Sequence, residues 1–274
     1  VDYTVNARTG FPLVTGPEGY EGAINHVLPV WDIVTGQAAM NALLIADRHR
    51  ANSGEGQYIK IPLADSAFST LSHLGYVAEV EINNIERPRT GNHVFGTFAY
   101  DFSTKDEKRI MITAFTKNHW QALLRATNSS SYFKDYELTK GIDLNLEENR
   151  YTHRNEIENY LTTWFLSRNS NQVHQALNKE GVCWGPYQTF REAVENDPDL
   201  STLNPMIEEI YQPGIGHYRA AGSFIDFSAI PREPVKPAPM LGQHTDEILS
   251  DYLKLTDKQI GKLYDKGLIS GVGR

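Results

Sequence analysis

The chain has 274 residues, of which 40% are hydrophobic and 22% charged, proportions that are typical of a folded globular protein. Its formal net charge is −8 and no segment is basic, so we expect no nucleic-acid partner, because binding to a duplex needs clustered basic residues. The single cysteine, Cys183, excludes an internal disulfide framework and a zinc site built from cysteines. Its apolar neighbours predict a buried, inert thiol.

Residues 1–30 are rich in glycine, proline and polar residues, which predicts extended loops. From Ile33 to about Arg50 the pattern is helical and apolar on nearly every face, which predicts a buried helix. Residues 57–61 read as a short strand, and Asp65 is a favourable N-cap for a helix from Ser66 to about Val80. Helix, turn, strand and helix in this order indicate an α/β arrangement.

The middle of the chain has a different pattern, because Arg87–Asn92 interrupts the regular elements. Alternating apolar residues predict a hairpin of residues 95–101 with residues 108–114. Helices are expected near 117–126, 154–167 and 170–180, and from a capping box at 189–192.

The last part of the chain reads as strands near 206–212 and 222–227, followed by a proline-rich connector over 231–239. Two short helices are expected near 245–254 and 257–266, the second with a capping box at Thr256. No basic flank with an apolar run marks a signal peptide at the N-terminus, and the charge-free stretch Ile33–Ala46 is too short to span a bilayer. We therefore expect a cytoplasmic protein without a membrane partner.

Asp32 is the main candidate for chemistry, because it directly precedes the apolar helix. Aspartate is a favoured N-cap, so a purely structural role explains this position well. A carboxylate can also be a covalent nucleophile, and the free N–H groups of a helix N-terminus could hold an oxyanion beside it. Position alone leaves both interpretations open.

The other chemical motifs are weak. The nine histidines lack metal-ligand spacing, and the chain has no Gly-x-Ser-x-Gly motif, so we expect no metal site and no serine hydrolase. Short glycine pairs such as Gly214 and Gly216 lack the setting of a dinucleotide fingerprint.

Several segments occur in a characteristic order along the chain: Tyr3–Gly10, Thr15–Gly16, Pro29–Gly36, Ala46–Arg50, Gly54–Gln57, Ile59–Asp65 and Pro237–Leu249. This ordered series resembles the class III CoA-transferases. The resemblance implies an α/β fold with a large nucleotide-fold-like domain and a smaller α+β domain. Residues 1–80 would be part of the large domain, 81–200 the linker and small domain, and 201–274 a segment returning to the large domain.

The resemblance also implies a mechanism. Asp32, followed by Gly36, matches the family's Asp-x-x-x-Gly nucleophile, which carries CoA as an aspartyl thioester. Coenzyme A would enter as part of an acyl-CoA substrate, with no other cofactor and no metal. Near Asp32, the substrate or CoA would contact Tyr3, Asn6, Asn25 and His26. Further contacts would come from a glycine-containing loop with Gly91, Asn92 and Gly96.

Five segments resemble family members that move CoA between the two carboxylates of mesaconate: Val1–Asn6, Asn25–Pro29, Trp31–Gln37, Arg87–Asn92 and Gln212–Gly216. Intermolecular transfer to another small carboxylic acid is a second hypothesis. Family members begin with a nucleotide-fold segment and form interlocked homodimers. The large domain would therefore be partial here, and a truncated, non-catalytic subunit that needs a partner chain is a third hypothesis.

Overall fold

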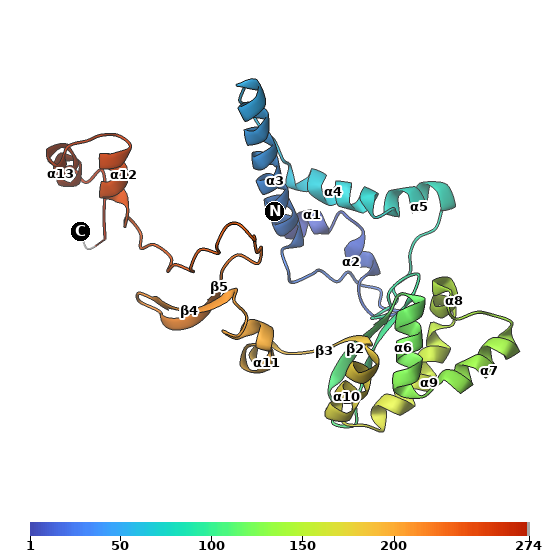
Figure 1. Ribbon diagram of the computed structural model, residues 1–274. Helices are drawn as coiled ribbons and strands as arrows, with labels where there is room; N and C mark the ends of the chain where they lie inside the picture. The colour runs from blue at the N-terminus through green and yellow to red at the C-terminus, as the bar shows by residue number, and fades with distance from the viewer. Residues whose placement is uncertain (273–274) are drawn as a thin grey trace. The chain divides into compact units, whose positions relative to one another are not determined.

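The computed structural model describes residues 1–272, which fall into two compact units, Val1–Tyr187 and Gln188–Arg274 (Figure 1). The first unit contains two separate hydrophobic cores, and the described part of the second contains a hairpin, three short α-helices and a 3-10 helix. The domain boundaries expected at residues 80 and 200 stay a prediction.

The first unit begins with five helices: α1 (Asp2–Asn6), α2 (Phe11–Val14), α3 (Val30–Ser53), α4 (Leu63–His73) and α5 (Tyr76–Asn83). Helices α1 and α4 pack against α3 and bury Val5, Trp31 and Ala67. Phe11 on α2 stacks on Trp31 with ring centroids 6.0 Å apart. This small core fixes the beginning of α3, where Asp32 lies.

Helix α3 was predicted correctly as a helix and wrongly as a buried one. Trp31 is its only buried residue, and Met40, Leu43, Leu44 and Ile45 are 57–67% exposed. The reason is that α1 and α4 cover α3 close to Trp31, and no residue of the described chain covers these four side chains. An apolar helix pattern predicts burial, but burial also requires another element of the protein to pack against the helix.

The two elements expected after α3 also differ from the structure. Residues 57–61 are extended but unpaired, because no strand of the described chain lies beside them, and Tyr58 is 84% exposed. The helix predicted from Ser66 to Val80 is two helices, separated at Gly75, whose φ of +85° ends the helical path. Pro62 is the N-cap of α4, and Asp65 lies in its first turn.

The second core of this unit is built on an antiparallel sheet of β1 (Phe98–Ser103), β2 (Arg109–Ala114) and β3 (Cys183–Pro186), in the order β1-β2-β3. The predicted hairpin of β1 and β2 is confirmed, with Phe98 opposite Ala114. Strand β3 was not predicted. Cys183 is exposed on this outer strand, so the prediction of a buried thiol is wrong.

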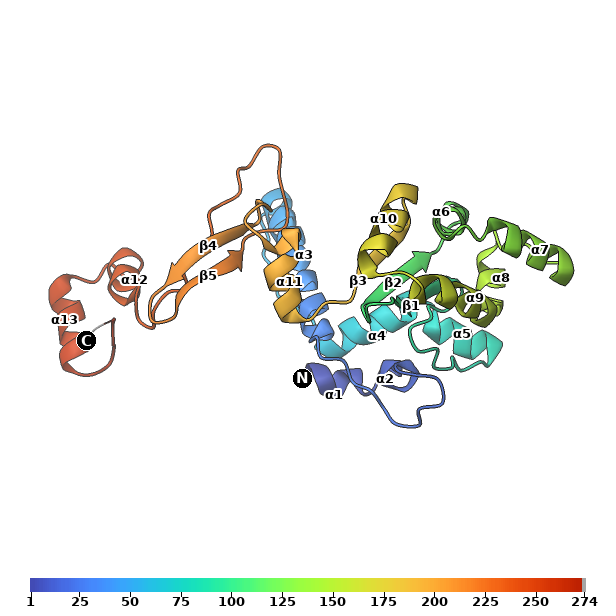
Figure 2. The same cartoon turned by 90° about the horizontal axis from the view of Figure 1, so that it is seen from below.

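Five helices accompany the sheet: α6 (Lys117–Thr127), α7 (Ser130–Lys140), α8 (Glu147–Thr152), α9 (Arg154–Leu166) and α10 (Ser170–Glu180) (Figure 2). The predictions of α6, α9 and α10 are confirmed, whereas α7 and α8 were missed. Helix α6 packs on β2, and α9 packs on β1 through Phe102 and Phe165, whose rings stack with centroids 4.3 Å apart. Each such buried phenylalanine contributes about 1.5–3 kcal/mol to stability. Because this core buries many more apolar residues than the core around Trp31, it contributes more to the stability of the unit.

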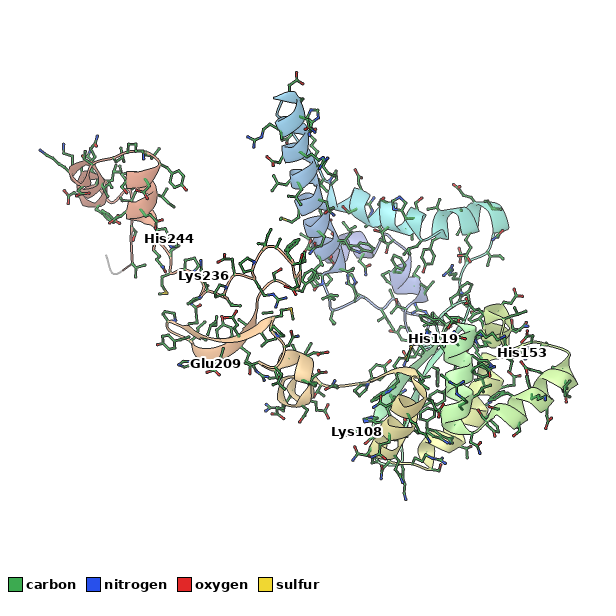
Figure 3. All side chains as sticks on the ribbon, viewed as in Figure 1. Lys108, His119, His153, Glu209, Lys236 and His244 are labelled. Carbon is green, nitrogen blue, oxygen red and sulfur yellow. The ribbon has the colours of Figure 1, made fainter. Side chains whose placement is uncertain are left out.

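The second unit contains α11 (Phe190–Asn196), a short 3-10 helix (Pro198–Leu200), β4 (Ile207–Gln212), β5 (Gly216–Ala221), α12 (Thr245–Asp251) and α13 (Asp257–Asp265). The capping boxes at Thr189 and Thr256 are confirmed. The strand predicted at 222–227 is wrong, because the chain turns at Gly214, with φ +80°, and pairs residues 216–221 with β4 instead. Figure 3 marks Glu209 on β4 and Lys236 in the connector. The Gln212 side chain ties this connector to β4 through the backbone of Ala238.

Among residues 1–272, no helix combines the length and the apolar character needed to cross a bilayer.

Candidate active site

Asp32 is the third residue of α3, after the N-cap Pro29. It is therefore not the N-cap that its position suggested. The side chain is exposed, and within the described part of the chain its carboxylate accepts no hydrogen bond and has no ionic partner. The Asp32 carboxylate is therefore open to a ligand.

Asp2 caps α3 in its place. One carboxylate oxygen of Asp2 accepts hydrogen bonds from the backbone N–H groups of Trp31 (2.6 Å) and Asp32 (3.1 Å). The other lies 2.9 Å from Nε2 of His26, which donates to it. The sequence suggested that these N–H groups could hold an oxyanion. They are not free to do so, because both donate to Asp2.

The Asp2 carboxyl is 2% exposed. Burial alone raises its pKa, but the hydrogen bonds from Asp32 N–H, His26 and Trp31 N–H outweigh burial, so the pKa lies below the usual aspartate value. Asp2 is thus an anion that is fully committed to holding the start of α3.

The four residues predicted beside Asp32 lie in one polar cluster around Asp2. Asn6 donates to the Asn25 side chain (2.6 Å) and accepts from the Trp31 indole (3.1 Å). The Tyr3 hydroxyl donates to the Val27 carbonyl, and the Tyr3 and His26 rings meet edge to face at 5.8 Å. Asn6 is buried and uses both ends of its amide, so its observed role is structural.

Tyr3 and His26 keep an accessible edge, with 45% of Tyr3 and 25% of the His26 side chain exposed. Substrate or CoA contacts by Tyr3, Asn6, Asn25 and His26 stay a prediction. Asp2 is the residue that sequence analysis missed. Its signal was indirect: α3 starts at a proline, which cannot cap with its side chain, so another residue had to satisfy the first N–H groups.

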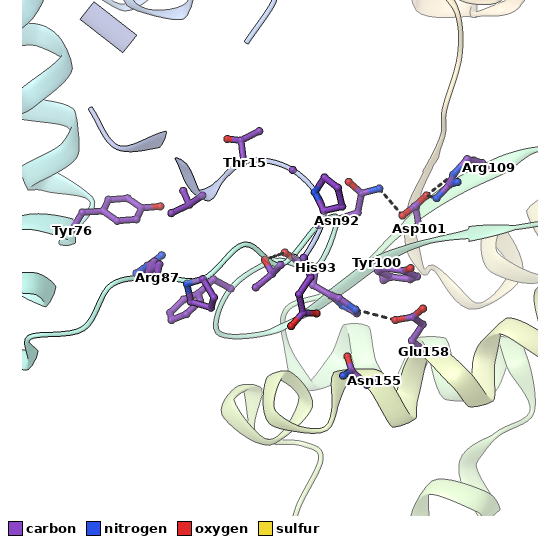
Figure 4. Close-up of a pocket in the computed structure, with 18 residues that line it drawn as sticks. Thr15, Tyr76, Arg87, Asn92, His93, Tyr100, Asp101, Arg109, Asn155 and Glu158 are labelled. Carbon is purple, nitrogen blue, oxygen red and sulfur yellow. Dashed lines mark hydrogen bonds and ion pairs between the residues drawn. The ribbon is translucent and has the colours of Figure 1, made fainter. Parts of the chain in front are cut away.

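A cavity of about 700 Å³ lies elsewhere in the first unit (Figure 4). Its walls are residues 14–18, the linker around Arg87 to Phe95, the edge strand β1 with Arg109, and α9. Gly91 and Asn92, two of the three predicted loop residues, line this cavity, whereas Gly96 and Asp32 do not. The structure thus brings the predicted residues together in two groups, one at Asp32 and one at this cavity.

Both guanidinium groups at the cavity are paired with carboxylates. Asp101 accepts from the Asn92 amide (2.7 Å) and from Arg109 Nε (2.6 Å), and Arg87 Nε donates to Glu79 (2.5 Å). The Arg87 guanidinium also lies over the Phe95 ring, 4.0 Å from its centroid. The lining also includes the carboxylates of Glu18 and Glu158, so the cavity is polar and suits a ligand that forms hydrogen bonds.

Within residues 1–272, no group of three or more histidine, cysteine, aspartate or glutamate side chains is arranged to hold a metal ion.

The comparisons with known proteins agree with this fold. The sequence model of CoA-transferase family III matches residues 1–245. The 2-methylfumaryl-CoA isomerase of Chloroflexus aurantiacus is 46% identical over all 274 residues, which are 67% of its own length. Human succinyl-CoA:glutarate CoA-transferase is 24% identical over 269 residues, which cover 98% of this chain and 59% of the human protein.

Solved structures support the same fold. A CAIB/BAIF family protein from Brucella suis superimposes with a TM-score of 0.66 at 21% identity, over 91% of this chain and 62% of its own. The Rv3272 protein of Mycobacterium tuberculosis gives a TM-score of 0.68 at 17% identity, over 90% of this chain and 62% of its own. The chain belongs to CoA-transferase family III. It spans about two thirds of the length of the Chloroflexus relative and three fifths of the human one.

Proposed function

We propose that the protein carries CoA on Asp32 and moves it between the two carboxylates of mesaconate, which isomerises 2-methylfumaryl-CoA. The observation that carries this proposal is the free, exposed Asp32 carboxylate on a helix start that Asp2 holds in place. The 46% identity to a 2-methylfumaryl-CoA isomerase supports the choice of substrate.

The reaction begins when a carboxylate oxygen of Asp32 attacks the thioester carbonyl carbon. The carbon–sulfur bond breaks, which gives a mixed anhydride and the CoA thiolate. The thiolate attacks the Asp32 carbonyl carbon and expels mesaconate as a carboxylate, so CoA is now held as a thioester on Asp32. Each step exchanges one acyl bond for another, which replaces one difficult transfer by easier ones.

The second half repeats these steps in reverse at the other end of the acid. Mesaconate turns round, and its other carboxylate attacks the Asp32 thioester carbonyl and releases the thiolate. The thiolate then attacks the mesaconyl carbonyl of the new anhydride, which frees Asp32 as a carboxylate. Atoms and charge balance, with no further reactant. Water must be kept from the anhydride and the thioester, because hydrolysis would release CoA.

The capping by Asp2 supports the division of roles between the two neighbouring aspartates. Asp2 is buried and accepts three hydrogen bonds, so its oxygens are poor nucleophiles and are out of reach of a substrate. Asp32 uses only its backbone in this arrangement. Because its backbone is fixed, Asp32 loses less orientational entropy in attack than a nucleophile on a mobile segment would.

Two further parts belong to the same proposal: an interlocked homodimer and a cytoplasmic location. Intermolecular transfer to another small carboxylic acid would use the same Asp32 chemistry and needs a separate acceptor. A non-catalytic subunit completed by a partner chain is the other alternative.

The test is an assay of the purified protein with 2-methylfumaryl-CoA and no acceptor acid, with the two regioisomers separated by chromatography. Asp32→Asn should lower turnover by at least about a thousandfold, because an amide cannot attack the thioester. Asp65→Asn is the matched control, since Asp65 is the third residue of α4 after a proline N-cap. It should change turnover less than about twofold. Isomerisation that needs an added acid would favour intermolecular transfer.

A further inference from the structure

The Thr90–Gly96 loop is shaped by its own backbone. Its two glycines have positive φ angles, +60° at Gly91 and +82° at Gly96, which other residues rarely adopt. Between them, His93 N–H donates to the Thr90 carbonyl (3.0 Å), and the Thr90 hydroxyl donates to the His93 carbonyl (2.8 Å). The loop is therefore a closed turn, and its position depends on what holds that turn to the rest of the unit.

His93 anchors the turn, together with the hydrogen bonds from Gly91 N–H to the Gly16 carbonyl (3.1 Å) and from the Asn92 amide to Asp101. Its ring stacks on Tyr100 of β1, with centroids 4.3 Å apart and planes at 24°. Its Nε2 lies 3.0 Å from a carboxylate oxygen of Glu158 on α9 (Figure 4). The side chains of His93 and Glu158 are 9% and 26% exposed. The ring thus joins the loop to β1 and α9 on the wall of the cavity.

The protonation state of His93 follows from the groups that face it. Burial lowers its pKa, which outweighs the raising effect of Glu158, and Arg154 adds to the lowering. Within residues 1–272, Nδ1 is buried without a hydrogen-bond partner. The ring is then neutral at neutral pH, with its proton on Nε2, where it donates to Glu158. Tyr100 has a pKa raised to about 12 by burial and by Glu158, so its hydroxyl stays neutral as well.

Two residues of the loop that line the cavity, Asn92 and Phe95, have backbone N–H groups without a hydrogen-bond partner in the described part of the chain. The Asn92 side chain is not available in the same way, because it donates to the buried Asp101. Backbone N–H groups on a fixed turn suit an acyl or carboxylate oxygen.

We propose that His93 and Glu158 are positioning residues for substrate binding, which hold the Thr90–Gly96 loop so that its backbone binds an oxygen of the acyl-CoA substrate in this cavity. The ligand class rests on the proposed function; the anchoring of the loop does not. The two residues act through the loop backbone rather than by touching the reacting atoms.

The test compares His93→Leu and His93→Gln with the wild type, using 2-methylfumaryl-CoA as substrate. Leucine removes the hydrogen bond and should raise KM about tenfold while kcat stays within about threefold. Glutamine keeps an amide donor near the Nε2 position and should restore KM to within about twofold of the wild type. His153→Leu is the matched control, because His153 makes a comparable bond to Tyr136 (2.8 Å), at the start of α9 and away from the cavity lining (Figure 3).

The pH profile separates positioning from general stability. In the wild type, KM should rise as pH falls below the usual histidine range, because protonation puts a charge on a buried ring. His93→Gln has no group that titrates there, so this rise should be absent. Glu158→Leu should match His93→Leu, and the double variant should be no worse than either single one.

Equal effects of His93→Leu and His153→Leu, an equal loss in kcat and kcat/KM, or failure of glutamine to restore KM would each overturn the proposal. Hydrogen exchange at the amides of Gly91 and His93, which donate to the Gly16 and Thr90 carbonyls, tests the anchoring without activity. Exchange should be slow in the wild type and at least about tenfold faster in His93→Leu. If the wild type does not isomerise 2-methylfumaryl-CoA, the proposed function fails. The hydrogen-exchange data then still test whether His93 holds the loop in place.

Discussion

Replacing Asp2 by alanine tests the capping of α3 most severely. The variant removes a buried carboxylate that accepts bonds of 2.6, 2.9 and 3.1 Å and leaves two helix N–H groups and the His26 ring without their partner. A hydrogen bond to a charged group contributes about 1.5–3 kcal/mol, and loss of a helix cap costs about 0.5–2 kcal/mol. Since the three bonds share one carboxylate, their effects are not additive, and we expect a loss of about 3 kcal/mol.

For a unit of the size of Val1–Tyr187, 1 kcal/mol corresponds to about 2–4 °C, so its unfolding temperature should fall by about 6–12 °C. Scanning calorimetry at pH 7 measures this shift for Asp2→Ala. Asp65→Ala is the control, because the Asp65 side chain has no hydrogen-bond partner among residues 1–272, and it should shift unfolding by less than about 2 °C.

The same comparison has a defined pH dependence. The pKa of Asp2 is lower in the folded protein than in the unfolded chain. Its contribution is therefore fully present above about pH 4 and is lost as pH falls through the lowered pKa. The difference between the wild type and Asp2→Ala should narrow below about pH 4. An unchanged unfolding temperature at pH 7, or a difference that widens in acid, would refute the capping argument.

Three further variants test other contacts. Arg89 donates to the carbonyls of Pro12, Thr15 and Gly22, so Arg89→Ala should speed proteolytic cleavage within residues 12–24 at least about fivefold. Arg150, fully buried, donates to two backbone carbonyls, and Arg150→Ala should cost about 2–4 kcal/mol in urea unfolding. Hydrogen bonds from Thr104 and Ser170 lower the pKa of Asp106 to about 2, and Ser170→Ala should raise it measurably in an NMR titration. Unchanged cleavage in Arg89→Ala, unchanged stability in Arg150→Ala, or an unchanged Asp106 titration in Ser170→Ala would contradict the corresponding contact.

Local signals predicted much of the fold. The capping boxes at Thr189 and Thr256 involve residues three positions apart, and both begin helices as expected. The β1–β2 hairpin depends on alternation over one short turn and was also predictable. Residues 57–61 have a strand pattern but no neighbouring strand in the described chain, and a strand is stable only when its backbone is paired.

The site was only partly predictable, because it also depends on contacts between residues far apart in the sequence. The order of motifs identified Asp32 and the residues clustered near it. However, the cap of α3 is Asp2, 30 residues away, and the cavity anchor joins His93 to Glu158, 65 residues away. Such pairs depend on tertiary packing, which no local pattern encodes. The exposed face of α3 shows a different failure of local prediction. Its apolar pattern predicts burial, but no element of the described chain packs against it.

The most direct test of the account is intact-mass analysis of the protein after incubation with 2-methylfumaryl-CoA, with and without mild hydroxylamine. The account predicts a CoA-sized adduct that hydroxylamine removes, that maps to the peptide containing Asp32, and that is absent in Asp32→Asn but present in Asp65→Asn. An adduct that persists in Asp32→Asn, or isomerisation by that variant at the wild-type rate, would contradict the assignment of Asp32 as the nucleophile.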